Sequence, residues 1–298
     1  MFGWLLTRML PFVPMPLVKA ISSRYVAGVT LGEAAGRVGL LNGQGYKATI
    51  DILGEDAKDA AHADGTVLGY QNVLARIMAD GLDSNISVKL SHLGIRLNQS
   101  DAEARLSRIL DTAAGLGSFV RIDMEDSGLT GTTLDLYRAL RTKYPHVGTV
   151  LQAALHRTAD DARALAAEGA NLRLCKGIYR EPRAIAFQSK ADIRQSYLET
   201  AEVLLSAERT YTAFATHDRV LLQRLLELTQ RMEVPRDRFE FQALLGVPVD
   251  DVLSGLVFNG YTVRWYVPFG EEWYAYSTRR LKENPKMASY IVRHWFGR

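Results

Sequence analysis

The sequence predicts an α/β protein with the fold of a distorted TIM-type (β/α)8 barrel. Three observations support this: eight short apolar runs have the length of strands, helical stretches separate them, and polar residues stand at their ends. A strand–helix unit repeated eight times closes into a parallel barrel. The carboxyl ends of its strands meet at one mouth, where catalysis takes place. The runs are Lys47–Leu53, Asn85–Leu90, Ser118–Met124, Thr149–Ala154, Asn171–Cys175, Tyr211–Ala215, Phe239–Leu244 and Thr262–Val267.

Length and composition agree with this fold. The 298 residues suit a barrel of about 250 residues with one extra segment. The chain is 47% hydrophobic and 23% charged, as soluble globular proteins are. Its net charge of +3 and its scattered arginines argue against a nucleic-acid partner. The single cysteine, Cys175, permits no intramolecular disulfide and fits a reducing cytoplasm.

Residues 1–46 are expected to form an N-terminal helical arm, and residues 47–298 the catalytic barrel. The first 18 residues are apolar, but three prolines between Pro11 and Pro16 prevent one continuous helix. The stretch is also too short to span a bilayer and lacks the pattern of a signal peptide. Two interpretations stay open: the arm packs on the barrel or a partner subunit, or it contacts a membrane surface through side chains such as Phe2 and Trp4.

The segments between the runs show helical patterns bounded by turn signals. Gly39–Tyr46, rich in glycine and asparagine, predicts a linker into the first strand. Asp56–Asp80 is amphipathic, and Asp101 is a candidate N-cap for the helix Asp101–Leu116. The next five predicted helices are Thr132–Lys143, Asp160–Glu168, Ala191–Glu208, Val220–Met232 and Pro248–Phe258.

The segment Glu272–Asn284 is the predicted eighth helix. Spacings of three and four residues put Tyr276, Arg279, Arg280 and Glu283 on one broad face. A helix that only covered the barrel wall would present apolar residues there. The adjacent arginines offer forked donors suited to a substrate carboxylate, and a solvated basic surface is the alternative.

The strand ends bring opposite charges together. Lys89 lies near the end of the second run and Asp123 near the end of the third, and we expect them to form an ion pair inside a cleft. Such pairs are often structural, so the residues alone leave the catalytic role of Asp123 open. Arg173 and Lys176 lie at the end of the fifth run.

Familiar nucleotide and metal motifs are absent. The sequence contains no G-x-G-x-x-G after a run, no G-x-x-x-x-G-K-[ST] and no H-E-x-x-H, so we predict neither a Rossmann domain nor a metal site. Two reaction classes remain. One is Schiff-base chemistry on Lys89 or Lys176, as in an aldolase; the other is redox chemistry with a flavin held by strand-end side chains. The paired arginines and nearby aromatic residues favour the second class, with a small apolar amino acid lying over the flavin ring.

Eight motifs occur in order along almost the whole barrel. They are LGE at Leu53–Glu55, SVKLSHLG at Ser87–Gly94, VRIDMEDS at Val120–Ser127, LQA at Leu151–Ala153, LRLCKGIYREP at Leu172–Pro182, FATHD at Phe214–Asp218, FEFQALLG at Phe239–Gly246 and YVPFGEEWYAYSTRRLKENP at Tyr266–Pro285. With this set the chain resembles proline dehydrogenase, the FAD enzyme of proline catabolism, in its bacterial monofunctional form. It is similar too to the corresponding domain of the bifunctional proline utilisation A proteins.

The resemblance implies a proline site at the barrel mouth, with the last helix above it. Charged residues would bind the carboxylate and amine of proline, and other residues would wall its ring. The charged set is Lys89, Asp123, Arg279 and Arg280; the ring set is Leu244, Tyr266 and Tyr276. Glu55 and Glu283 match acidic residues that support the arginine pair.

For FAD the resemblance implies a second set, of which Arg173 is expected near flavin N5, where its charge stabilises the reduced ring. The set is Met124, Gln152, Arg173, Lys176, Gly177, Ile178, Thr216 and His217. Asp123 and Arg173 are the residues expected to act in catalysis. Departures from the family pattern, such as Cys175 for valine and Leu245 for tyrosine, remove no charged group.

The activity that the resemblance implies is hydride transfer from C5 of L-proline to flavin N5, which gives Δ1-pyrroline-5-carboxylate. This is the first step of proline degradation to glutamate, and the electrons pass to a membrane quinone. A cytoplasmic enzyme is expected, alone or as a homo-oligomer, and the quinone would give the N-terminal arm a use at the inner face of the plasma membrane.

Overall fold

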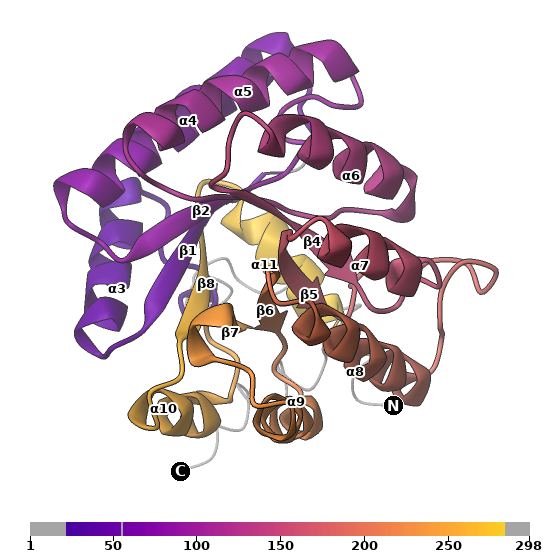
Figure 1. The fold of residues 1–298 in the computed structure, drawn as a ribbon. Helices are drawn as coiled ribbons and strands as arrows, with labels where there is room; N and C mark the ends of the chain where they lie inside the picture. Colours follow the sequence, from indigo (N-terminus) through magenta and orange to yellow (C-terminus); the bar gives the residue numbers. More distant parts are fainter. Residues whose placement is uncertain (1–21, 55, 284–298) are drawn as a thin grey trace.

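The computed structural model describes residues 22–54 and 56–283, with side chains up to residue 278. Its eight parallel strands form one closed barrel in sequence order (Figure 1). They are β1 Lys47–Ile52, β2 Ser84–Val88, β3 Val120–Ile122, β4 Val147–Gln152, β5 Asn171–Cys175, β6 Tyr211–Ala215, β7 Phe239–Leu244 and β8 Val263–Phe269. The predicted (β/α)8 barrel is therefore confirmed.

The strands follow the predicted runs closely. β5, β6 and β7 begin and end at the predicted residues, and the others differ by a few residues at one end or both. Pairing of Lys47–Ile52 with Arg264–Phe269 closes the ring between β1 and β8. The outward side chains of the strands, such as Ile50 and Val267, are buried in the core between the barrel and its helices.

Seven helices of the described chain follow the strands in the expected alternation and surround the barrel (Figure 1). They are α4 Ala60–Ala79, α5 Gln99–Gly115, α6 Ser127–Arg141, α7 Thr158–Ala167, α8 Lys190–Ser206, α9 Arg219–Arg231 and α10 Asp250–Phe258, with a 3₁₀ turn at Arg236–Arg238 before β7. The predicted N-cap Asp101 was wrong. Asn98 caps α5 instead, because its side chain accepts a hydrogen bond from the backbone N–H of Asp101 at 3.0 Å.

The linker predicted at Gly39–Tyr46 was wrong for most of its length, because helix α3 spans Leu31–Gly43. A capping box between Thr30 and Glu33 starts this helix. Its buried face includes Val38 and Leu41, which belong to the same core as the barrel. α3 packs against both β1 and β8. It therefore covers the part of the wall where the eighth helix of a regular barrel would lie.

The last helix, α11 (Trp273–Glu283), has a different position. Figure 1 shows it inside the outline of the strand ring, whereas α4–α10 lie outside. Tyr276 packs with Leu53, which directly follows β1, and with Tyr25 and Val26. These contacts place the helix over the carboxyl ends of the strands, as the resemblance implied.

The expectations for residues 1–21 concern a segment outside the described residues. Among the helices that the structure describes, none is both long and apolar enough to cross a membrane.

Candidate active site

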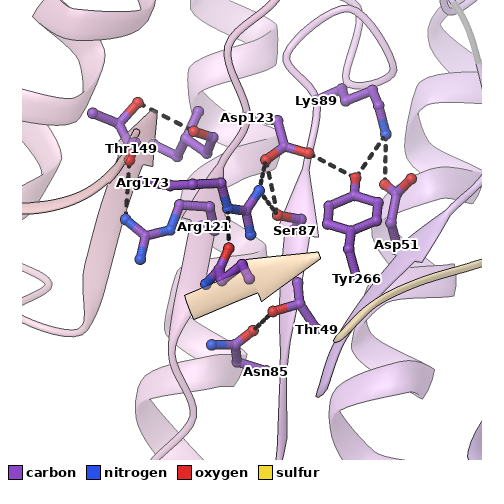
Figure 2. Close-up of polar contacts among 12 residues, drawn as sticks. Thr49, Asp51, Asn85, Ser87, Lys89, Arg121, Asp123, Thr149, Arg173 and Tyr266 are labelled. Carbon is purple, nitrogen blue, oxygen red and sulfur yellow. Dashed lines mark hydrogen bonds and ion pairs between the residues drawn. The ribbon is translucent and has the colours of Figure 1, made fainter. Parts of the chain in front are cut away.

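Asp123 and Arg173 form the centre of a polar cluster at the carboxyl end of the barrel (Figure 2). Asp123 directly follows the short strand β3, and Arg173 lies in the middle of β5. One nitrogen of Arg173, Nη1, lies 2.6 Å from Asp123 Oδ1 and 3.2 Å from Ser87 Oγ. The Ser87 hydroxyl also donates to Asp123 at 2.9 Å. The two residues expected to act in catalysis are thus in contact, and both are largely buried.

Tyr266 connects this pair to Lys89. The phenol donates to Asp123 Oδ2 at 2.8 Å, and Lys89 Nζ lies 3.5 Å from the phenolic oxygen (Figure 2). The expected ion pair between Lys89 and Asp123 is not what the structure shows. Lys89 Nζ instead lies 2.6 Å from Asp51 Oδ1, because Asp51 is on β1, the strand beside β2. Asp123 takes Arg173 as its partner.

The charges of the cluster influence one another strongly. Burial alone would lower the pKa of Lys89, but the carboxylates of Asp51 and Asp123 outweigh it and raise that pKa above its usual value. Burial raises the pKa of Asp51, and Lys89 offsets only part of this effect. Burial and both carboxylates also raise the pKa of Tyr266 well above its usual value. At neutral pH the mouth therefore holds an ammonium group and a neutral phenol.

A second layer of charged residues lies deeper in the barrel. Glu240 is buried and pairs with Arg264, whose Nε and Nη2 lie 2.8 and 3.1 Å from its two oxygens. The amide of Gln242 donates to Glu240 and accepts from Arg173 Nε at 2.6 Å. Arg121 is fully enclosed, and burial and the charge of Arg173 lower its pKa to about 9. The barrel interior is thus polar, unlike the packed aliphatic interior of many barrels.

The residues expected to bind FAD lie within or directly after β4, β5 and β6, except Met124, which lies after β3; these four strands are consecutive in the barrel. Gln152, the last residue of β4, is buried and donates to the carbonyl of Glu125 at 2.8 Å. Gly177 has φ +93°, and a Cβ there would lie 3.2 Å from Ala154 Cβ and 3.3 Å from Gln152 Oε1. Glycine is therefore required both for the turn and for the close approach to Gln152.

Two contacts fix the loop after β5. Lys176 Nζ lies 2.5 Å from Asp218, which Arg194 also contacts at 2.7 Å. Burial opposes ionisation of Asp218, yet the two cations hold its pKa well below the usual range. Glu181 accepts from the backbone N–H of Ser127 at 2.8 Å and from its hydroxyl at 2.7 Å, at the start of α6. The loop is thereby connected to the segment that carries Asp123.

The remaining expected cofactor residues surround the same edge. Met124 is buried beside Asp123, and Thr216 is buried after β6. His217 is exposed, and Ile178 keeps 43% of its surface exposed although it is apolar. The strand ends therefore divide into a half around Asp51, Lys89 and Tyr266 and a half that carries Gly177 and the exposed side chain of Ile178.

Leu244 and Tyr276, expected beside the ring of proline, lie at the end of β7 and in α11. Glu55 lies outside the described residues. Arg279, Arg280 and Glu283 belong to α11, but their side chains lie outside the described part of the chain. The expected carboxylate site therefore stays a prediction.

The sequence interpretation missed several members of the site because it treated the strands as apolar runs. Asp51, Ser87 and Glu240 lie within runs, and only the ends were taken as candidates. The missed signal is an alternation of period two, such as Thr49–Asp51 in β1 and Glu240–Gln242 in β7, which places polar residues on the inner face of the barrel.

The sequence of the chain matches known proteins of one family. A family model described as proline dehydrogenase matches residues 34–293. The chain is 35% identical to proline dehydrogenase 2 of Bacillus subtilis over 276 residues, which cover 92% of this chain and 90% of that protein. It is 34% identical to proline dehydrogenase of Deinococcus radiodurans over 281 residues, 91% of this chain and 89% of the other.

A solved structure supports the fold. Proline utilization A from Bdellovibrio bacteriovorus, inactivated by N-propargylglycine, matches with a TM-score of 0.83 at 24% identity. The match covers 94% of this chain and 34% of the other, so this chain spans about a third of that protein.

Proposed function

Because the chain belongs to the proline dehydrogenase family of oxidoreductases, we propose that it oxidises L-proline to Δ1-pyrroline-5-carboxylate with FAD as cofactor. The observation that carries the proposal is the cluster of Lys89, Asp123, Arg173 and Tyr266 beside the ends of β4, β5 and β6. One half offers groups for an amino acid and the other offers room and donors for a nucleotide.

The residues present fit FAD. Gly177 turns the chain after β5 close against Gln152, and the exposed apolar surface of the neighbouring Ile178 suits the face of an aromatic ring system. We propose that Gln152, Lys176, Thr216 and His217 supply donors for the cofactor, with Met124 packed beside them. FAD, when bound, supplies the acceptor of the hydride from C5 of proline.

The protein's own part is to bind and orient the substrate and to set its protonation. Arg279 and Arg280 are proposed to hold the carboxylate, supported by Glu55 and Glu283, while Tyr276 and Leu244 wall the ring. The ammonium of Lys89 disfavours a second positive charge nearby and so favours the neutral amine of proline. Asp123 is held by Arg173, Ser87 and Tyr266, and this fixes the carboxylate that faces the amine.

A Schiff-base lyase is disfavoured by the electrostatics of the two candidate lysines. Such chemistry requires a neutral amine, and therefore a lysine whose pKa is lowered. The pKa of Lys89 is raised by Asp51 and Asp123, and Lys176 is paired with Asp218.

The wider setting is part of the same proposal. Electrons would pass from the reduced cofactor to a membrane quinone, and the enzyme would work in the cytoplasm or at the inner face of the plasma membrane. We also propose residues 1–46 as an arm distinct from the catalytic barrel of residues 47–298. Its helix α3 nevertheless shares the barrel's core.

The test is an anaerobic visible spectrum of the purified protein before and after L-proline is added. A flavin band that bleaches supports cofactor, substrate and reaction together. A yellow protein that does not bleach would overturn the substrate, and a colourless protein that stays inactive with added FAD would overturn the cofactor.

A tenfold or larger rise in the KM for proline is expected for Arg279→Met and for Arg280→Met, since each loses about 1.5–3 kcal/mol of charge-assisted bonding.

A further inference from the structure

The side of Arg173 that faces away from Asp123 has its own partner. Arg173 Nε donates to Gln242 Oε1 at 2.6 Å, and both side chains are buried. Neither Gln242 nor Glu240 belongs to the set proposed above for substrate or cofactor. Their contacts form a chain that runs from the deep layer of the barrel to Arg173: Arg264, Glu240, Gln242 and Arg173.

The direction of every hydrogen bond in this chain is fixed by chemistry. A guanidinium can only donate, and an ionised carboxylate can only accept. Gln242 lies between the two, so its carbonyl must face Arg173 and its amide nitrogen must face Glu240. The anion of Glu240 therefore determines how the amide of Gln242 is oriented.

Glu240 is well held as an anion. Burial opposes its charge, but Arg264 outweighs burial and lowers its pKa below the usual value. Arg264 contacts both oxygens at 2.8 and 3.1 Å, and the hydroxyl of Tyr211 donates to one of them at 3.0 Å. A carboxylate with this many partners cannot rotate freely, so it keeps the amide of Gln242 in one orientation.

We propose that Glu240 and Gln242 are positioning residues, which hold the guanidinium of Arg173 where negative charge develops on the reduced cofactor. This inference rests on the proposed function. Arg173 has three hydrogen-bond partners, Asp123 and Ser87 on one side and Gln242 on the other, and its guanidinium lies 5.3 Å from the centre of the Tyr266 ring. Without Gln242 the Nε side of the guanidinium loses its acceptor, and only the contacts of Nη1 and the Tyr266 ring orient the group.

Replacing Glu240 by glutamine has a specific consequence. Arg264 Nε and Gln242 donate to Oε1 of Glu240, and Arg264 Nη2 and Tyr211 donate to Oε2. With its oxygen in the place of Oε2, the new amide keeps the bonds from Arg264 Nη2 and Tyr211, and its nitrogen faces both Arg264 Nε and Gln242. Gln242 would then rotate to accept from it, and its own amide nitrogen would face Arg173, donor against donor. Glu240→Gln should therefore cause the same defect as Gln242→Met, which removes the acceptor and keeps the volume.

The experiment measures the midpoint potential of the bound flavin without substrate, together with kcat and KM for proline. Both variants should shift the potential to more negative values and lower kcat by roughly 10-fold, less than the loss of a direct contact because the effect is indirect. The KM should stay within about 2-fold, since neither residue belongs to the proposed carboxylate site. Thr49→Val is the matched control, because Thr49 bonds Asn85 at 2.5 Å inside the barrel, apart from this chain (Figure 2).

The double variant Glu240→Gln with Gln242→Glu tests the donor–acceptor order of the hydrogen bonds from Arg264 to Arg173. It keeps the total charge, gives Arg173 an acceptor again, and lets the new glutamine donate to the new glutamate. Recovery of kcat to within about 3-fold of wild type is expected from restored donor–acceptor order.

Three results would overturn the inference. The first is an unchanged potential and kcat in both single variants, and the second is an equal change in Thr49→Val. The third is failure of both single variants to fold while Thr49→Val folds, since that would make the chain structural only. A wild-type protein that proline does not bleach would instead refute the proposed function, so the two failures can be told apart.

Discussion

Removal of the Asp51 charge gives a sharp test of the electrostatics at the mouth. Asp51→Asn keeps the size of the side chain but leaves Lys89, 2.6 Å away, without its main counter-charge. Taking one partner from a buried ion pair costs about 3–5 kcal/mol. Lys89 keeps 23% of its side chain exposed and has Tyr266 at 3.5 Å, so we expect the lower end, about 3 kcal/mol.

The loss should be visible as a lower Tm and should depend on pH. In a chain of this length about 3 kcal/mol corresponds to a drop of roughly 6 °C. In the wild type the raised pKa of Lys89 contributes stability that is complete below about pH 10.4 and is lost as pH rises through the folded value. In the variant, burial becomes the dominant influence and lowers that pKa, so stability rises with pH instead. The difference between the two proteins should therefore shrink as pH approaches about 10.

Asp83→Asn is the matched control. It also removes an aspartate from a lysine, Lys47 at 2.8 Å, but that pair is exposed, with 40% and 55% of the side chains accessible. The expected cost is below about 1 kcal/mol. Thermal melts and urea titrations of both variants compare the two directly. If Asp51→Asn costs no more than Asp83→Asn, or if its deficit grows with pH, the reasoning about the buried pair is refuted.

Three further predictions concern the cofactor half. Gly177→Ala should raise the Kd for FAD at least 10-fold, as measured by flavin fluorescence titration. The control Gly81→Ala, also at positive φ but in open space, should leave the Kd unchanged. Equal effects of the two variants would contradict the role of the close approach between Gly177 and Gln152. Glu181→Gln should lower stability by about 1 kcal/mol and speed FAD release, measured by urea unfolding and stopped flow; an unchanged release rate would show that the contact with Ser127 does not serve the cofactor. Asp218→Asn should have a lower Tm than the wild type above about pH 4, and the two Tm values should converge as the pH falls further below this value. A Tm difference that stays constant into strong acid would contradict the lowered pKa of Asp218.

The barrel could be predicted from the sequence because each strand is a short apolar run between turn signals. The bounds of β5, β6 and β7 were correct for this reason. The end of helix α3 was not predicted, since Gly39 and Gly43 were taken as signs of a linker. Tertiary burial of Val38 and Leu41 outweighs the weak helix propensity of glycine, which meets open space at Gly43.

Partners inside the site could be predicted only in part. The sequence places Lys89, Asp123 and Arg173 at strand ends, and the structure brings them to one cluster. Which cation pairs with which carboxylate depends on strand register and on distances across the barrel, and neither can be read from local spacing. Asp51 was missed because an acidic residue inside a strand is recognisable only by its alternation with outward apolar neighbours.

α3 covers the barrel wall where the eighth helix would lie, and α11 lies over the mouth instead, so the two helices contribute differently to stability. The wall between β8 and β1 is completed by a helix that precedes the first strand, so the main core closes without α11. Of the described side chains of α11, Tyr276 packs in a small separate cluster with Tyr25, Val26 and Leu53, and Trp273 lies beside it. The described residues of the main core include none from α11, so that core does not depend on them. We therefore expect α11 to separate from the barrel at a lower free-energy cost than global unfolding, as local openings at binding sites do.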